Sequence, residues 1–311
     1  RRYESAGGKK IEPAMIRVGL AGYGLAGKVF HGMLVKATQG MEVRAISTGN
    51  SDRQAQALKD FPKARIAATF DKLIGGGDLD LVVLGTPHDV HCAQALSAFE
   101  KGLHVVSDKI MCLSVAEADA MLSASKKAGK LLSVFHNRRW DSDFLPVLDV
   151  LGKGLLGDPV LIESSVVRGG PDPSPAPPLE QRAWRGRSDK GGGPFRDWGA
   201  HLMDQALILG GGFPESVFCQ LEHRRPGLGL ETMASCEMKF LSNSPHPNPL
   251  PKGERGQSLR IRVEVGGHSW VPRPRWYIQG TQGTLVMEGL DPQEDWLKKG
   301  EVVSGTEKAK F

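Results

Sequence analysis

The chain has 311 residues, more than one hydrophobic core usually organises, and 40% hydrophobic with 24% charged residues is a globular rather than a disordered composition. No segment approaches the roughly 20 consecutive apolar residues that a membrane span requires. The net charge of +5 is scattered, without the basic runs and interleaved aromatic residues of a nucleic-acid-binding surface. We therefore expect two folded domains, with neither a membrane nor a nucleic acid as partner.

The N-terminal segment and the cysteines indicate the cellular location. Residues 1–14 are charged and lack the apolar stretch of a secretory signal peptide, so Met15 is expected to be the natural start. The four cysteines are widely spaced and form neither a CxxC pair nor a metal-ligand cluster; they are Cys92, Cys112, Cys219 and Cys236. We predict a cytoplasmic protein without a metal site.

From Met15 onward, short apolar runs alternate with segments of helical periodicity. The expected strands are 16–20, 43–47, 66–68, 79–84, 104–107 and 131–135, and the expected helices are 29–38, 53–60, 91–101 and 115–128. The run at 79–84 is almost wholly apolar, as in strands that are buried on both faces of a parallel sheet. The alternation predicts an α/β fold in which residues 15–136 form a Rossmann domain with a doubly wound parallel sheet.

After residue 136 the pattern changes, and residues 137–311 are expected to form a second domain of the α+β class. Helices are expected at 144–151 and 200–209, and strands at 159–168, 216–223, 232–241, 259–265, 275–279 and 284–288. A long loop rich in proline and glycine covers 169–194, and the pattern at 266–274 supports no assignment. The succession of short alternating strands predicts a mostly antiparallel sheet.

Residues 244–257 interrupt this second pattern. Proline occurs at every second position from Pro245 to Pro251, and each proline removes a backbone donor that a sheet would need. We therefore expect an insert that forms an external loop at a hairpin tip. Such a loop costs little stability, because loop-closure entropy grows slowly with length.

A glycine-rich turn follows the first strand directly. Gly22, Gly24 and Gly27 have the spacing G-x-G-x-x-G between that strand and the next helix. In dinucleotide-binding folds the first glycine allows the tight turn, the second lets the backbone approach the pyrophosphate, and the third permits close helix packing. The alternative is a glycine turn without a ligand, but the strand and helix units on both sides favour a dinucleotide site.

The end of the second strand indicates which dinucleotide is bound. NAD-binding domains usually place an acid there to bind the ribose hydroxyl, whereas this chain has Ser47 and Thr48, followed by Arg53. A guanidinium near hydroxyl side chains suits the 2′-phosphate of NADP. Arg53 is equally compatible with a solvated residue in the first helical turn, with Asp52 as the N-cap. We predict NADP as the cofactor, with NAD as the alternative.

Polar residues share one face of the helix expected at 200–209. At 100° per residue, one sector of about 100° holds Asp197, His201, Asp204 and Gln205. The alternative is a solvated face with Asp197 as the N-cap, but a histidine one turn from an aspartate has the charge control that proton transfer requires. Lys109 follows the strand at 104–107 and is therefore expected at the sheet edge where ligands bind, facing the cofactor. The alternative interpretation is that Lys109 is an ordinary surface lysine.

Together these motifs resemble those of the glucose-fructose oxidoreductase, inositol dehydrogenase and rhizopine-catabolism family, called Gfo/Idh/MocA, over nearly the whole chain from Met15. The matching segments are Gly85-Thr-Pro-His-Asp-Val-His91, Val106-Ser-Asp-Lys109-Ile110, Phe135-His-Asn-Arg-Arg-Trp-Asp141 and Asp197-x-x-x-His201. In that order, they resemble the family's cofactor loop, its Glu-Lys-Pro motif, its Asn-Arg-Arg segment and its catalytic Asp and His. Within the family, the chain is most similar to NADP-preferring scyllo-inositol dehydrogenase-like members.

The resemblance implies a Rossmann domain followed by an open-faced sheet domain that binds substrate and mediates a homodimer or homotetramer. It also implies an NAD(P)-dependent oxidoreductase that transfers hydride between nicotinamide and a carbinol or carbonyl carbon of a polyol, sugar or inositol. In this chemistry His201 is the acid/base, Lys109 stabilises the alkoxide and Asp197 orients the histidine. Further cofactor contacts are expected from Thr86, Pro87, His91 and Lys109, and substrate contacts from Arg138, Trp184, Arg185 and Asp204. The competing hypothesis is an NADP-binding sensor without catalytic activity.

Three departures from the family pattern bear on activity. Asp108 stands where the family has glutamate, and Ile110 where it has the proline that stiffens the lysine loop. The chain also ends at Phe311, before the last element that relatives usually carry, so a final strand is expected to be missing. Together with the insert at 244–257, these departures predict looser positioning of Lys109 and weakened turnover.

Overall fold

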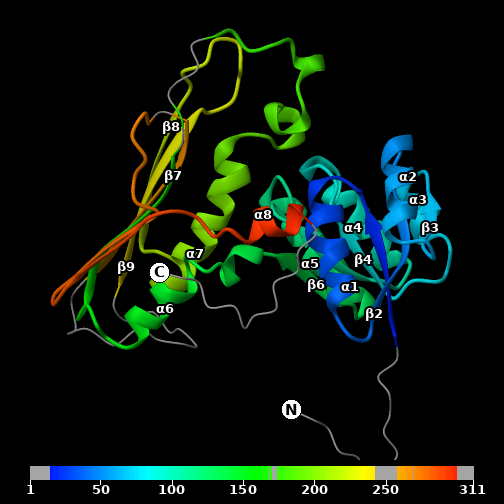
Figure 1. Cartoon of the computed structure of the whole chain (residues 1–311), viewed down its shortest axis with the longest axis horizontal. Helices are drawn as coiled ribbons and strands as arrows, with labels where there is room; N and C mark the ends of the chain where they lie inside the picture. Colours follow the sequence, from blue (N-terminus) through cyan, green and yellow to red (C-terminus); the bar gives the residue numbers. More distant parts are fainter. Residues whose placement is uncertain (1–14, 168, 170–173, 242–257, 268, 300–311) are drawn as a thin grey trace, which may run out of the picture.

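The computed structural model describes residues 15–167, 169, 174–241, 258–267 and 269–299. These residues form two domains, each built on one six-stranded sheet. Figure 1 shows the first domain on the right and the second sheet on the left, with helix α7 beside that second sheet. No helix within these ranges is long and apolar enough to cross a membrane.

Sheet A confirms the expected Rossmann architecture. Its strands are β1 (Ile16–Ala21), β2 (Met41–Ser47), β3 (Arg65–Ala67), β4 (Leu81–Leu84), β5 (His104–Asp108) and β6 (Leu132–Phe135). All neighbouring strands are parallel, in the order β3-β2-β1-β4-β5-β6. The order reverses between β1 and β4, and in such sheets ligands bind at this point, beyond the carboxyl ends of the strands. The loops that follow β1, β4, β5 and β6 therefore define the candidate site.

Helices connect the strands of sheet A. They are α1 (Met33–Ala37), α2 (Ser51–Asp60), α3 (Phe70–Ile74), α4 (His91–Glu100) and α5 (Val115–Ala128). A π-helical turn, Ala26–Gly32, precedes α1, so the first helical segment begins before the predicted residue 29. The N-cap of α2 is Asn50, whose side chain accepts a hydrogen bond from the Arg53 backbone N–H. The alternative with Asp52 as the N-cap is therefore wrong.

Sheet B confirms the mostly antiparallel second sheet. Its strands are β7 (Pro159–Val167), β8 (Ser216–Glu222), β9 (Met233–Leu241), β10 (Ser258–Gly266), β11 (Trp276–Gly280) and β12 (Thr284–Met287). Their order is β12-β11-β7-β10-β9-β8, and of these neighbours only β7 and β10 are parallel. Helices α6 (Leu145–Gly152) and α7 (Ala200–Gly210) pack on one face. The core between them includes the fully buried Phe144, Ile162, Leu202, Met238 and Trp276.

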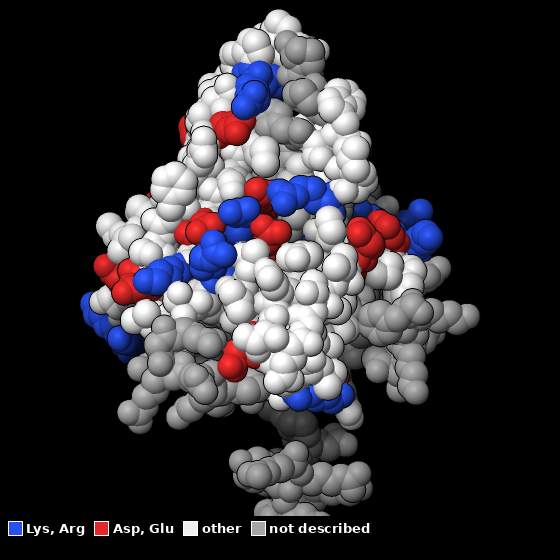
Figure 2. Space-filling model, turned by 90° about the vertical axis from the view of Figure 1, so that its left-hand side faces the viewer, with Lys and Arg blue, Asp and Glu red and all other residues white. Residues whose placement is uncertain are grey.

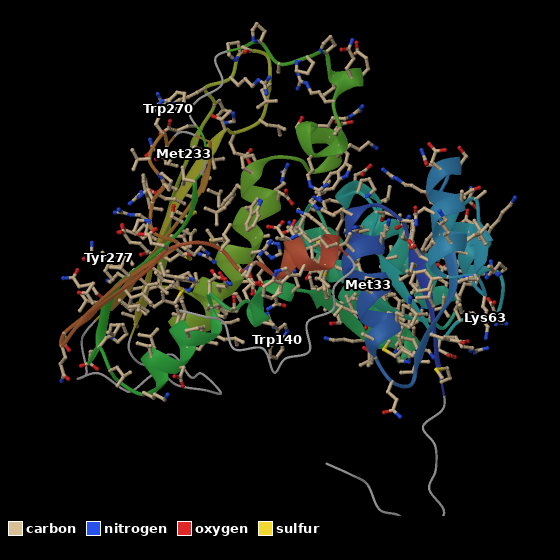
Figure 3. All side chains as sticks on the ribbon, in the orientation of Figure 1. Met33, Lys63, Trp140, Met233, Trp270 and Tyr277 are labelled. Carbon is tan, nitrogen blue, oxygen red and sulfur yellow. The ribbon has the colours of Figure 1, made fainter. Side chains whose placement is uncertain are left out.

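The opposite face of sheet B carries polar side chains. The strand register places Glu163, Glu237, Arg262 and Tyr277 on this face, and Arg262 lies 3.0 Å from a carboxylate oxygen of each glutamate. Figure 2, viewed from the side of sheet B, shows a band of mixed positive and negative charge across the molecule. Figure 3 shows Tyr277 on the same side. This face is the open face that the family resemblance implies.

Some segments differ from the sequence-based expectations or lie outside the described residues. Helix α8 (Gln293–Lys298) was not predicted, because six residues are too few for a helical periodicity to be recognised. The expected loop at 169–194 contains three short 3₁₀ turns, Leu179–Gln181, Trp184–Gly186 and Ser188–Lys190. The insert at 244–257 and the residues after 299 lie outside the described ranges. Leu241 and Ser258 are partners in antiparallel β9 and β10, so the insert joins two paired strands.

Candidate active site

The glycine turn after β1 has the shape that a dinucleotide requires. Gly22 has a φ of +90°, and a Cβ there would lie 2.6 Å from the carbonyl oxygen of Gly85. A Cβ on Gly27 would collide with the carbonyl oxygen of Gly22. At Gly24, by contrast, the nearest heavy atom is Nη1 of Arg53, 3.9 Å from the Cβ position. Two glycines thus serve close backbone packing, and the third leaves open space where a pyrophosphate would approach.

Arg53 lies beside this turn. It is exposed in the first turn of α2, and within the described ranges its side chain has no ion pair. Ser47 and Thr48, at the end of β2, are buried, and the Ser47 carbonyl oxygen accepts a hydrogen bond of 2.9 Å from the Gly22 N–H. The end of β2 therefore offers a cation and no carboxylate next to the glycine turn.

His91 contacts the loop after β4 and the loop after β5. It is fully buried; its Nε2 lies 2.9 Å from the Thr86 carbonyl oxygen, and its Nδ1 lies 2.9 Å from that of Ile110. The Thr86 hydroxyl donates to Gln94 at 2.7 Å, and Pro87 precedes the short turn His88–Val90. His91 thus joins the loop after β4 to the loop after β5.

Lys109 and Asp197 come from different domains and meet at the carboxyl edge of sheet A. The Lys109 ammonium donates to Asp197 Oδ1 at 2.5 Å and also to the Asp197 carbonyl oxygen. Arg185 Nε lies 3.3 Å from the other carboxylate oxygen. Burial lowers the pKa of Lys109, although Asp197 opposes this effect. Burial alone would raise the pKa of Asp197, but the charges of Lys109 and Arg185 outweigh it and the pKa is lowered. Burial thus opposes the charged form of Lys109, whereas its charge and that of Arg185 favour the carboxylate form of Asp197.

Asp108 holds the backbone at Lys109 from the Rossmann side. Its Oδ1 accepts a hydrogen bond of 2.8 Å from the Lys109 N–H, and its Oδ2 lies 3.5 Å from Nε2 of the buried His31. The His31 ring packs on Phe135, with 4.4 Å between ring centroids. His31 belongs to the helical segment that follows the glycine turn. Through His31, Asp108 thus connects the helical segment after the glycine turn to the loop that carries Lys109.

His201 lies in the first turn of α7 and is 6% exposed. Its pKa is well below the ordinary value of 6.5, because burial and the nearby positive charge of Lys109 disfavour the imidazolium. Its Nδ1 is buried and has no hydrogen-bond partner among the described residues. Asp197 was expected to orient this ring, but its carboxylate is instead engaged by Lys109 and Arg185. The described contacts give His201 a neutral imidazole that Asp197 does not hold.

Two further histidines at the site were not among the predicted residues. His136 follows β6, and its ring lies 6.5 Å from that of His201, with Nδ1 3.8 Å from Asp204. His88 follows β4; its Nδ1 lies 2.9 Å from the Gly191 carbonyl oxygen. Burial lowers the pKa of both histidines. Both residues stand within the quoted family-like segments at carboxyl ends of strands, and this position was the signal that would have found them.

The four predicted substrate residues fall into two groups. Trp184 packs edge-on against His88 at 4.6 Å between ring centroids, and Arg185 lies beside both Trp184 and Asp197, so these two residues are at the site. Arg138 is 7% exposed and is bound by Asp141 and Glu294 at 2.9 and 2.8 Å. Asp204 accepts two hydrogen bonds from Arg139, of 2.6 and 2.7 Å. Arg138 and Asp204 thus have their charges neutralised within the protein.

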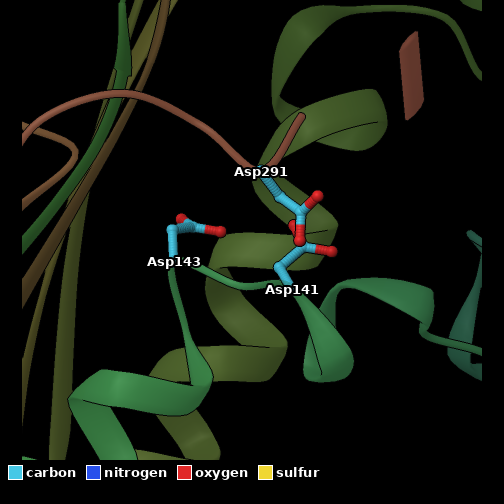
Figure 4. Close-up of side chains that lie close together, drawn as sticks. All are labelled: Asp141, Asp143 and Asp291. Atoms are coloured by element: carbon cyan, nitrogen blue, oxygen red, sulfur yellow. The ribbon is translucent and has the colours of Figure 1, made fainter. Parts of the chain in front are cut away.

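Behind the site, buried acids connect the chain near α8 to the domain junction. Figure 4 shows Asp141 and Asp291 with their carboxylates close together and Asp143 beside them. Asp143 lies 2.7 Å from Nε of the buried Arg275, and Asp291 accepts a hydrogen bond from the Ser142 N–H. Burial raises the pKa of Asp141 to about 6. Because arginines neutralise part of this cluster, we interpret it as a structural support for the junction.

Comparisons with known proteins match both domains. A model described as "oxidoreductase family, NAD-binding Rossmann fold" matches residues 16–136, and one described as "GFO/IDH/MocA C-terminal domain" matches residues 144–286. The chain belongs to the Gfo/Idh/MocA family of oxidoreductases. This finding confirms the resemblance, and with it a Rossmann fold of the kind that binds a nicotinamide cofactor.

Individual members of the Gfo/Idh/MocA family are similar over most of the chain. The uncharacterized oxidoreductase YdgJ of Escherichia coli is 35% identical over 92% of this chain and 75% of its own length. The scyllo-inositol 2-dehydrogenase (NADP(+)) IolW of Bacillus subtilis is 30% identical over 94% of this chain and 74% of its own length. The solved structure of the putative oxidoreductase YPO2259 from Yersinia pestis is 34% identical, with a TM-score of 0.77 over 94% of this chain and 75% of that one.

Proposed function

We propose that this oxidoreductase is an NADP(H)-dependent dehydrogenase that transfers hydride between nicotinamide C4 and a carbinol or carbonyl carbon of a polyol, sugar or inositol. One observation carries the proposal: Lys109 from the Rossmann domain meets Asp197 from the sheet domain, close enough to His201 to lower its pKa. IolW, named as an NADP-linked scyllo-inositol 2-dehydrogenase, is similar over most of this chain and supports both the cofactor and the substrate class.

The cofactor is proposed to lie along the carboxyl edge of sheet A. Gly24 offers the open backbone for the pyrophosphate, and Arg53 beside it is the cation for the 2′-phosphate. Ser47 and Thr48 offer hydroxyls near the ribose, and Thr86 and Pro87 border the nicotinamide side. When bound, NADP(H) supplies or accepts the hydride. The protein contributes binding, orientation and the handling of the substrate proton.

His201 is proposed to accept the hydroxyl proton of the substrate during oxidation and to return it during reduction. Its lowered pKa keeps the imidazole neutral at neutral pH, which is the form that accepts a proton. Lys109 is proposed to act as a cation that its ion pair with Asp197 holds in place, and this cation stabilises the negative charge that develops on the substrate oxygen. The proposed role of Asp197 is thus to position Lys109, and its influence on His201 is indirect.

The substrate is proposed to lie between the two domains. Trp184 and Arg185 border the Lys109–Asp197 pair and can contact substrate hydroxyls directly. Arg138 and Asp204 are proposed to shape the pocket from behind, since Asp141, Glu294 and Arg139 already bind their charged groups. His91 is proposed to position the cofactor loops through the backbone of Thr86 and Ile110.

The protein is further proposed to act in the cytoplasm as a homodimer or homotetramer. The uncovered face of sheet B supports the assembly, because exposed Phe218 on β8 and Val286 on β12 flank the charged residues of that face. Charged pairs such as Arg262 with Glu163 would set the relative orientation of two copies. Size-exclusion chromatography with light scattering measures the assembly directly.

The function is tested by assaying a panel of polyols, sugars and inositols with NADP+ and NAD+ and following absorbance at the nicotinamide band. The proposal predicts turnover of at least one polyol, faster with NADP+. Isothermal titration with NADPH is run in parallel. Tight NADPH binding without turnover of any panel member would favour the sensor hypothesis, and absence of binding to either dinucleotide would contradict both hypotheses.

A further inference from the structure

Two cysteines face each other across the edge of sheet B. Cys219 on β8 and Cys236 on β9 are direct partners in the antiparallel register. Among the described residues, strand β8 is the last strand of the sheet and pairs with β9 alone. Cys219 is exposed, whereas Cys236 is 2% exposed and belongs to the core beneath α7. The pair therefore consists of one solvent-accessible thiol and one buried thiol. Both cysteines lie far from the glycine turn and from Lys109 in the sequence.

The register places both thiols on the same face of the β8–β9 pair, directly opposite each other. Burial, followed by the side-chain hydrogen bond with Cys219, raises the pKa of Cys236 to about 12. The buried thiol is therefore protonated and unreactive by itself, whereas Cys219 is the sulfur that an external reagent reaches first.

We propose that Cys219 and Cys236 are a covalent modification site, at which a peroxide oxidant closes an intramolecular disulfide between β8 and β9. In the first step the Cys219 thiol loses its proton, the thiolate attacks a peroxide oxygen and the O–O bond breaks; a sulfenic acid forms, and the leaving hydroxide takes up a proton to give water. In the second step the Cys236 sulfur attacks the sulfenic sulfur, the S–O bond breaks, and a second water leaves. The two thiols lose two electrons and two protons, and hydrogen peroxide is reduced to two molecules of water.

The geometry favours ring closure within one chain. Directly opposite residues in an antiparallel pair have Cβ atoms about 4.5–5.5 Å apart, and a disulfide needs about 3.5–4.5 Å. Strand β8 can make the small movement that brings the two Cβ atoms closer, because within the described ranges it has a neighbouring strand on one side only.

The test uses the full chain in a background in which Cys92 and Cys112 are replaced by serine, so that the pair supplies all remaining thiols. After treatment with hydrogen peroxide, we expect loss of both thiols, a mass lower by two hydrogen atoms, and recovery with dithiothreitol. Peptide mapping is expected to link Cys219 to Cys236. Thermal unfolding checks that the background variant is folded, and the linked protein is expected to melt at a higher temperature because the bond restricts the unfolded chain.

Single variants separate the two steps. In Cys236→Ser on the same background, peroxide is expected to give a Cys219 sulfenic acid that a dimedone probe traps, with no loss of two hydrogens. In Cys219→Ser, the buried Cys236 is expected to stay unmodified at the same dose. Any of three results would overturn the proposal. Both thiols could persist after peroxide treatment, each thiol could gain oxygen without forming a link, or the disulfide could form between two chains. None of these outcomes depends on dehydrogenase activity.

Discussion

Arg53 provides a direct test of NADP recognition. Its guanidinium is exposed beside Gly24 and without an ion pair in the described part of the chain, so a 2′-phosphate would find it free. A hydrogen bond to a charged group contributes about 1.5–3 kcal/mol. Because Arg53 is exposed, solvent and salt screen the contact and the lower end applies. About 1.5 kcal/mol corresponds to roughly a tenfold change in Kd.

Arg53→Ala is therefore expected to raise the Kd for NADPH about tenfold and to leave the Kd for NADH unchanged. Fluorescence titration measures both constants. Lys59→Ala is the matched control, because Lys59 is an exposed cation in the last turn of the same helix. The effect should shrink as salt is raised. Equal weakening of both dinucleotides by Arg53→Ala, or equal affinities in the unmodified protein, would refute the assignment of Arg53 to the 2′-phosphate.

Three further predictions follow from the fold and the domain junction. Gly24→Ala should fold normally yet weaken NADPH binding, whereas Gly27→Ala should lower the Tm because its Cβ meets a backbone oxygen; equal Tm values would contradict the packing of this turn. The pKa of Asp141 is about 6 in the folded protein, above its ordinary 3.8, so the native state binds this proton more tightly than the unfolded chain. The free energy of unfolding should therefore fall as pH rises from 3.8 to about 6, by at most about 3 kcal/mol, and Asp141→Asn should lack this fall in urea titrations. Replacing residues 244–256 by a short turn should leave the Tm and activity nearly unchanged, since the segment joins the ends of two paired strands; loss of cooperative unfolding would show that it is structural.

The fold was largely predictable because local patterns specify it. The apolar run at 79–84 and the glycine turn at Gly22 indicated a parallel sheet with a dinucleotide site, and both indications agree with sheet A. The antiparallel alternation of the second half indicated sheet B. Helix α8 escaped prediction, since its six residues are too few to establish a periodicity.

The sequence indicated which residues lie at the candidate site more accurately than it indicated which of them contact one another. Lys109 and Asp197 were both expected at the site, but their ion pair joins two domains, and no sequence spacing encodes such a contact. The sequence instead suggested that Asp197 serves His201, its neighbour one turn away. Similarly, Arg138 is bound by Glu294 of a helix that was not predicted. Long-range partners are set by tertiary packing, which a pattern within one element does not contain.

The central claim is that Lys109 and His201, from different domains, act on the same substrate hydroxyl. The most direct test measures kcat and kcat/KM of His201→Ala and Lys109→Ala with the best polyol from the panel. Lys126→Ala, at an exposed lysine in the last turn of α5, is the control; thermal unfolding checks that each variant is folded, and NADPH affinity is a further check for His201→Ala. Both active-site variants should lose about 10²-fold or more in kcat and kcat/KM together, and His201→Ala should keep its NADPH affinity. Full turnover in either active-site variant would contradict the shared role of these two residues.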